Sequence, residues 1–143
     1  MILFCDTSAL VKLYVREEAS ERMVALAGSA ATIAVCRLAW AEAMAALARR
    51  ARENPADAEL ITGIRTRMRS DWPHYALVEV TQSLVELAGE YADTFALRGY
   101  DSVQLAAARI LQEATDEEFH FAVFDTRLEK SARVLGMRTL ASG

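Results

Sequence analysis

Short apolar runs alternate along the chain with longer segments of helical spacing. Runs typical of buried strands lie at residues 2–5, 31–35, 76–80 and 121–124, and residues 137–140 form a candidate last strand. Helices are predicted for residues 7–15, 20–27, 37–52, 55–70, 83–95 and 126–135, with another that begins at Asp101. Because helices separate the short apolar strands, the pattern predicts a parallel sheet that is covered on both faces.

Several residues mark where these helices are expected to begin and end. Gly28 is expected to stop the second helix, and Gly99 is expected to stop the helix before Asp101. Pro55 suits the first turn of a helix, and Ser83-x-x-Glu86 has the form of a capping box at a helix start.

The composition is that of an ordinary globular chain. The 143 residues are 53% hydrophobic and 25% charged, which fits a single folded domain. No apolar stretch approaches the ~20 residues that a membrane span needs, and the first residues do not resemble a secretion signal, so we expect a cytoplasmic protein. Cys5 and Cys36 form no CxxC pair and are expected to be buried, reduced thiols.

Four acidic residues stand in apolar surroundings. Asp6 and Asp125 each end an apolar run, Glu42 lies within an alanine-rich helix, and Asp101 opens another apolar segment. A buried carboxylate is costly unless a cation meets it, and no Lys or Arg is obviously paired with each of the four. The pattern therefore suggests a metal ion as the counter-charge. Ligand sites in parallel sheets lie beyond the carboxyl ends of the strands, which predicts that Asp6 and Asp125 share one site.

Each acid also has a structural interpretation. Asp6 can cap the helix that follows it, and Asp101-x-x-Gln104 is itself a capping box. Thr126-x-x-Glu129 is the better box for the last helix, which leaves Asp125 one residue outside it. Glu42 has only leucine and alanine three and four residues away on either side, so it is predicted to lie on an apolar helix face.

The formal net charge is −4, but basic residues are unevenly distributed. Arginines concentrate between positions 37 and 69, where a locally basic surface is compatible with contacts to nucleic-acid phosphates. A solvated helical face explains the same pattern. The candidates for phosphate contact, here called the arginine cluster, are Arg49, Arg50, Arg52, Arg65 and Arg69.

Carboxylates at strand ends favour chemistry that depends on a hard divalent cation, since such ions take oxygen ligands. A phosphatase of the haloacid-dehalogenase type needs a second Asp two residues after the first, and position 8 is Ser. A receiver domain needs its Asp at the end of a mid-chain strand, whereas Asp57 lies in a helical segment. A metal-dependent phosphodiesterase remains.

Four segments carry a resemblance to a known family. The segment FCDTSALVKLY at residues 4–14 resembles the opening of PIN-domain ribonucleases, in particular the VapC-type toxins of bacterial toxin–antitoxin pairs. Trp40-Ala41-Glu42 resembles the helical glutamate motif, and LRGYDSVQLAAA at residues 97–108 is similar to the third motif. FDTRL at residues 124–128 resembles the fourth, although Val123 replaces a hydroxyl residue that many members carry. The matches follow the family order.

The resemblance implies a PIN-like three-layer α/β fold over residues 1–143, with a five-stranded parallel sheet between helices. It also implies RNA cleavage that depends on Mg²⁺ or Mn²⁺. The implied catalytic residues are Asp6, Glu42, Asp101 and Asp125, of which Asp6, Asp101 and Asp125 would hold the metal. Candidate contacts to water or substrate are Thr7, Ser8 and Arg98, and Arg98 can equally pair with one of the acids.

The implied partners are an RNA substrate, a cognate antitoxin protein and a second copy of the chain in a homodimer. Two other interpretations stay open. A non-catalytic PIN-fold binding module would use the acids to dock a basic peptide, and a PIN nuclease could act without an antitoxin. Loss of an acid would favour the binding module, and this chain has all four.

Overall fold

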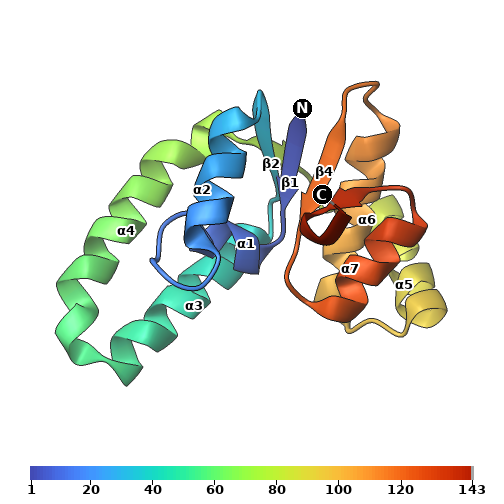
Figure 1. The fold of residues 1–143 in the computed structure, drawn as a ribbon. Coiled ribbons are helices and arrows are strands. Elements are labelled where there is room, and N and C mark those ends of the chain that lie inside the picture. Colours follow the sequence, from blue (N-terminus) through green and yellow to red (C-terminus); the bar gives the residue numbers. More distant parts are fainter. Residues whose placement is uncertain (143) are drawn as a thin grey trace.

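The computed structural model describes residues 1–142, and it contains one parallel sheet flanked by helices on both faces (Figure 1). The sheet has five strands in the order β3-β2-β1-β4-β5. The strands are β1 (Ile2–Cys5), β2 (Thr32–Cys36), β3 (Ala76–Val78), β4 (Phe119–Ala122) and β5 (Arg138–Thr139). The predicted fold class is therefore confirmed.

The seven helices of this part of the chain form the two outer layers. They are α1 (Thr7–Lys12), α2 (Ser20–Ser29), α3 (Ala39–Glu53), α4 (Ala58–Asp71), α5 (Gln82–Phe95), α6 (Gly99–Glu113) and α7 (Thr126–Val134). Helices α1 to α4 lie on one side of the sheet and α5 to α7 on the other (Figure 1).

The central strand β1 supplies side chains to both layers because successive residues of a strand point to opposite faces. Ile2 and Phe4 pack in the core with α5, α6 and α7, whereas Leu3 and Cys5 pack in the core with α1, α2 and α3. All four are buried. A continuous apolar run is thus required here, since neither face of the strand meets water.

Strand pairing places β4 two residues earlier than the predicted 121–124. Cys5, the last residue of β1, pairs with Ala122, and beyond this point the chain after β1 turns into α1. Val123 and Phe124 therefore have no partner on β1 with which to continue the ladder. A strand was correctly predicted in this part of the chain, but the register with β1 places it at residues 119–122.

Two predicted glycine stops were wrong. Gly28 lies inside α2, which continues to Ser29, and Gly99 is the first residue of α6. Helix α5 ends instead at Phe95, and its C-cap Ala96 adopts the left-handed conformation with φ 53°. The N–H of Leu97 then bonds the carbonyl of Ala92 at 3.2 Å, which closes the helix end.

The capping box predicted at Ser83-x-x-Glu86 is also wrong, because α5 begins one residue earlier than Ser83. Thr81 is the N-cap, and its side chain accepts a hydrogen bond from the N–H of Leu84 at 3.2 Å. Thr81 has the extended backbone that an N-cap requires.

Helices α3 and α4 form an antiparallel arm that extends from the rest of the molecule (Figure 1). Pro55–Asp57 forms the short 3-10 turn between them, which agrees with the predicted break. Leu47, Ile61 and Met68 are buried between the two helices and α1. The arm is thereby anchored to the helix that directly follows β1.

Both cysteines are buried and unpaired, as predicted. Burial raises the pKa of each thiol, so both stay protonated at neutral pH. None of the helices in residues 1–142 has the length and apolar character to cross a membrane.

The revised start of α5 gives a stability prediction. Thr81→Ala removes the side-chain oxygen that satisfies the N–H of Leu84, so the free energy of unfolding should fall by about 1 kcal/mol. Ser83→Ala at an exposed position inside the helix should change it by less than about 0.5 kcal/mol. Urea denaturation of both variants measures the two values. A larger loss in Ser83→Ala than in Thr81→Ala would contradict the assignment of the cap.

Candidate active site

The strand order reverses direction at β1, because the chain moves from β1 to β2 and β3 on one side and later to β4 and β5 on the other. Ligand sites of parallel sheets occur at the carboxyl ends of the strands beside such a reversal. A pocket of about 450 Å³ lies there. It is lined by Asp6, Thr7, Ser8, Val11, Glu17, Glu42, Ala46, Arg50, Arg98, Asp101, Gln104 and Asp125. The structure therefore brings the four predicted acids to one pocket.

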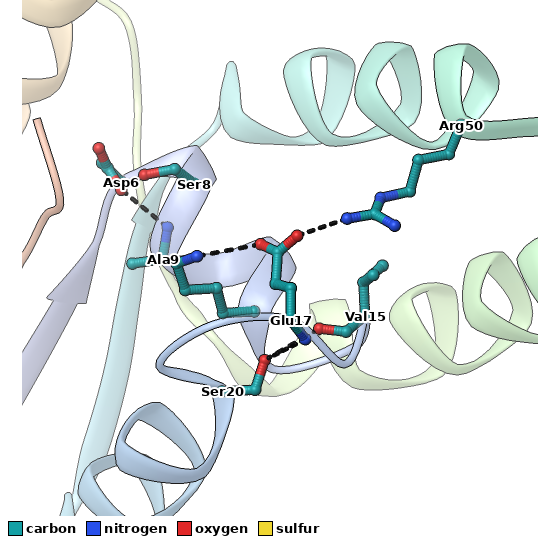
Figure 2. A network of polar contacts seen from close by, with 8 residues as sticks. Asp6, Ser8, Ala9, Val15, Glu17, Ser20 and Arg50 are labelled. Carbon is teal, nitrogen blue, oxygen red and sulfur yellow. Dashed lines mark hydrogen bonds and ion pairs between the residues drawn. The ribbon is translucent and has the colours of Figure 1, made fainter. Parts of the chain in front are cut away.

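Asp6 directly follows β1 and caps α1 while it lines the pocket. Its Oδ1 accepts hydrogen bonds from the N–H of Ala9 and the hydroxyl of Ser8, both at 2.9 Å (Figure 2). The side chain is almost fully buried, with 7% of the residue exposed. Burial, opposed by these two bonds and reinforced by the charges of Asp101 and Glu42, raises the pKa of Asp6 to about 6.

Glu42 lies in the first turn of α3 and is held by two neighbours. The hydroxyl of Thr7 donates to its Oε1 at 2.7 Å, and Nε2 of Gln104 donates to the same oxygen at 3.2 Å. Burial raises the pKa of Glu42 and these bonds oppose the rise. The apolar helix face predicted around Glu42 is only partly buried, because Ala45 and Ala46 are exposed and Ala46 borders the pocket.

Asp101 lies in the first turn of α6 and does not cap it. Its Oδ2 is 3.4 Å from both Nε and a terminal nitrogen of Arg98, whose side chain is 84% exposed. The predicted capping box with Gln104 is wrong, since Gln104 instead bonds Glu42 and the hydroxyl of Thr7. Asp101 and Gln104 both line the pocket because residues three apart lie on the same face of a helix.

Asp125 follows β4 by two junction residues and is the N-cap of α7. Its Oδ1 accepts a hydrogen bond from the N–H of Leu128 at 2.9 Å. The prediction that Thr126 would cap this helix and leave Asp125 outside it was therefore wrong. Asp125 is exposed, whereas Asp6 at the equivalent place after β1 is buried.

Two polar pocket residues, Gln104 and Glu17, were not recognised as site candidates from the sequence. Gln104 is buried with 3% exposed, and its Oε1 has no hydrogen-bond partner in residues 1–142. Its spacing of three residues from Asp101 on one helix was the available signal. Glu17, in the turn between α1 and α2, had no such signal, because only the tertiary structure brings it to the pocket.

The arginine cluster is divided between different surfaces. Arg50 lines the acidic pocket. Arg69 lies 5.2 Å above the ring of Trp40 and lines a separate pocket that contains none of the four acids. Arg49 and Arg52 are exposed at the end of α3, and Arg65 is half-buried on α4. One member of the cluster therefore lies where it could meet a phosphate in the acidic pocket without rearrangement of the arm.

The chemistry of the pocket fits a hard divalent cation in charge and donor type. The candidate ligands are all carboxylates, and both hydrogen bonds to Asp6 go to Oδ1, which leaves Oδ2 without one among the described residues. Burial raises the pKa of Asp6 and the charges of Asp101 and Glu42 add to the rise, so a cation would favour its ionised form. As arranged in residues 1–142, however, no three acidic, His or Cys side chains form a group that could hold a metal. Each acid is held by its own protein donors.

Comparison with known proteins defines the class. A family model described as the PIN domain matches residues 3–134. Ribonuclease VapC45 and Ribonuclease VapC49, from two strains of Mycobacterium tuberculosis, are each 33% identical over 137 residues, which is 96% of this chain and 93% of the relative.

Solved structures show the same fold at low sequence identity. A toxin–antitoxin complex from Klebsiella pneumoniae matches with TM-score 0.64 and 18% identity over 90% of each chain. VapBC2 from Rickettsia felis, bound to a DNA fragment from its promoter, matches with TM-score 0.64 and 11% identity over 97% of each chain. FitAcB from Neisseria gonorrhoeae matches with TM-score 0.64 and 16% identity over 97% of this chain and 96% of that one.

The fold and the acidic pocket thus define a PIN-like α/β protein. The chain belongs to the PIN-domain family, and its relatives place it with the VapC proteins of that family.

The raised pKa of Asp6 predicts a stability that depends on pH. Between the ordinary value of 3.8 and about 6 the folded state binds a proton that the unfolded state has lost, so ionisation of Asp6 destabilises the fold as pH rises. In metal-free buffer at pH 7, Asp6→Asn should therefore raise the free energy of unfolding, by at most about 3 kcal/mol. The gain should disappear near pH 4.

Denaturation with urea across this pH range measures the effect. Asp93→Asn, at an exposed position on α5, is the matched control and should show no comparable gain. A gain in Asp6→Asn that is equal at pH 4 and pH 7 would contradict the electrostatic origin.

Proposed function

We propose that this protein is a metal-dependent endoribonuclease that hydrolyses phosphodiester bonds of RNA, and that it is the toxin of a type II toxin–antitoxin pair. The observation that carries the proposal is the convergence of the four acids of the PIN-like motifs on one pocket, at the reversal of strand order. Relatives named as ribonucleases that align over nearly the whole chain support it. We also propose that residues 1–143 act as one domain, since one sheet carries all the strands of residues 1–142.

Asp6, Asp101 and Asp125 are the proposed ligands of Mg²⁺ or Mn²⁺. When bound, such an ion supplies positive charge for the scissile phosphate and lowers the pKa of an attacking water. The protein contributes rigid attachment, because Asp6 and Asp125 each cap a helix through Oδ1. Asp101 is attached to the first turn of α6, whose next turns are buried in the core. Three separate elements thus fix the proposed ligands.

Glu42 is the proposed acceptor of a proton from the attacking water. Both of its hydrogen bonds go to Oε1, so Oε2 has none among the described residues. Burial raises the pKa of Glu42 above its ordinary value, which makes this carboxylate a stronger base. Thr7 and Gln104 orient the side chain, and Ser8 does the same for Asp6. We propose that the hydroxyls of Thr7 and Ser8 act chiefly by positioning the acids.

Arg98 has a different proposed role. It lies against Asp101 in a mostly exposed position, so it can exchange this carboxylate for a phosphate oxygen of the substrate at little structural cost. We further propose that the arginine cluster contacts RNA through Arg49, Arg50, Arg52, Arg65 and Arg69. Of these five residues, Arg50 lines the pocket that contains the acids.

The proposed partners are a cognate antitoxin and a second copy of the chain. The solved neighbours include toxin–antitoxin complexes, which supports an antitoxin partner. A basic segment of that antitoxin would pair with the carboxylates of the pocket through charge-assisted hydrogen bonds and so exclude the metal. We propose that the protein acts in the cytoplasm. The competing non-catalytic binding module would bind the same basic peptide but cleave no RNA.

Metal-dependent cleavage is the first test. Metal-stripped protein incubated with total RNA should produce new, mappable ends only after Mg²⁺ or Mn²⁺ is added, and Asp101→Asn should abolish them. The variant should remain folded, because the loss of one carboxylate relieves repulsion in the pocket. Cleavage by Asp101→Asn at the wild-type rate, after contaminating nucleases are removed, would disprove the assignment.

Metal binding itself provides the control. At about a hundred times Kd, a cation that binds only the folded form should raise the free energy of unfolding by roughly 2.7 kcal/mol. This increase should shrink in Asp101→Asn. Thermal unfolding that responds to neither ion would favour the non-catalytic binding module.

Co-expression tests the partner. If an adjacent small gene encodes an antitoxin, cells that express this chain alone should stop growing, and cells that express both should grow. Asp101→Asn expressed alone should be harmless, which links the toxicity to the pocket. Light scattering on the purified chain then measures whether it is a dimer. Equal growth with and without the small gene, with intact wild-type protein, would reject the toxin role and leave the nuclease activity to the cleavage assay.

A further inference from the structure

Glu17 is a fifth acid that lines the pocket, and it binds two cations at once. Its Oε1 is 3.1 Å from Nζ of Lys12 on α1, and its Oε2 is 2.5 Å from a terminal nitrogen of Arg50 on α3. Figure 2 shows the carboxylate of Glu17 between these two helices. The side chain of Glu17, in the turn between α1 and α2, thus links α1 to the last turns of α3 in the arm.

The turn that carries Glu17 is itself fixed. The backbone N–H of Glu17 donates to the hydroxyl of Ser20 at 3.0 Å, and this hydroxyl donates to the carbonyl of Val15 at 3.0 Å (Figure 2). Ser20 is buried, with 8% exposed. The carboxylate therefore projects from a braced turn, which makes its position a property of the fold.

The two cationic partners of Glu17 are not equivalent. The side chain of Lys12 is 14% exposed, and its Nζ also lies 4.7 Å from the ring centroid of Phe124, the residue before Asp125. The side chain of Arg50 is 43% exposed. An ammonium that is nearly buried cannot easily lose its counter-charge, whereas an exposed guanidinium can change partners with little penalty.

This asymmetry suits a polyanionic substrate. The acids of the pocket repel RNA, and an arginine is a good bidentate ligand for a phosphate group. If Arg50 turned from Glu17 to a phosphate, Glu17 would keep Lys12 as its partner, so no carboxylate would be left unpaired. The other members of the arginine cluster lack this placement, since Arg50 alone among them lines the pocket.

We propose that Arg50 binds an RNA phosphate beside the scissile one, and that Glu17 is a positioning residue that holds Arg50 at the pocket and releases it to the substrate. This inference rests on the proposed ribonuclease function. Glu17 competes with the phosphate for Arg50, so its charge weakens substrate binding, and Lys12 keeps Glu17 in place during the exchange. The contact acts on substrate binding and leaves the chemical step to the four acids.

The test measures binding of a single-stranded RNA to the Asp101→Asn protein over a range of salt concentrations. Adding Arg50→Ala should weaken binding about tenfold at low salt, because one charge-assisted contact is lost. It should also reduce the slope of log K against log salt by about 0.7. In the active protein, Arg50→Ala should raise KM and leave kcat nearly unchanged, which a structural role would not produce.

A double-mutant cycle isolates the contribution of Glu17. Glu17→Gln should tighten RNA binding, and this gain should largely vanish when Arg50→Ala is also present, because the two residues compete through one contact. The ion pair between Arg16 and Glu21 is a matched control, since it is exposed and lies outside the pocket. Arg16→Ala and Glu21→Gln should change neither the slope nor KM.

Several outcomes would overturn the inference while the proposed function stands. The first is that the wild-type protein cleaves RNA but Arg50→Ala changes RNA binding no more than Arg16→Ala does. The second is that Arg49→Ala and Arg50→Ala weaken RNA binding equally. The third is that the effects of Glu17→Gln and Arg50→Ala on RNA binding are additive. If wild-type protein neither binds nor cleaves RNA, the proposed function itself fails. Urea denaturation of each variant confirms that it is folded.

Discussion

Concentrated negative charge at the carboxyl ends of β1 and β4 is the constraint on which the site depends. Asp6 is nearly buried and feels both Asp101 and Glu42, so its ionised form is unfavourable without compensation. The fold provides partial compensation through hydroxyl and amide donors, of which Thr7 and Gln104 serve Glu42. These donors fix the directions of the acids but cannot neutralise them, so negative charge remains in the pocket that a cation would offset.

The parallel sheet is what allows such a pocket to exist. A central strand that is buried on both faces gives Asp6 a rigid origin, and the reversal of strand order leaves the space beyond β1 and β4 free of a covering helix. Helices α1 and α7 then start at the acids themselves, so one oxygen of each Asp is used for capping. The capping and site interpretations of these residues are therefore compatible, because a carboxylate has two oxygens.

The basic residues near the pocket differ in how deeply their side chains are buried. Lys12 is held between Glu17 and the ring of Phe124, whereas Arg50 and Arg98 are more exposed and each lies against a carboxylate of the pocket. An exposed ion pair contributes little to stability, so such arginines are available for other anions. The pocket thus combines a fixed acidic centre with exchangeable cations around it, an arrangement suited to a phosphodiester substrate that must approach negative charge.

The parallel fold and the convergence of four acids on one pocket could be predicted from the sequence by itself. Both follow from local patterns, namely short apolar runs typical of buried strands and carboxylates that stand after such runs or within apolar helical segments. The sequence misplaced the caps at Thr81 and Asp125 and the extent of β4, because competing local signals there are resolved by strand register and packing. Only the tertiary structure decided that Arg50 reaches the pocket while Arg69 covers Trp40, and that Glu17 joins the acids. Such contacts join residues far apart in the chain, and the physical reason is that helix packing sets their distances while local spacing does not.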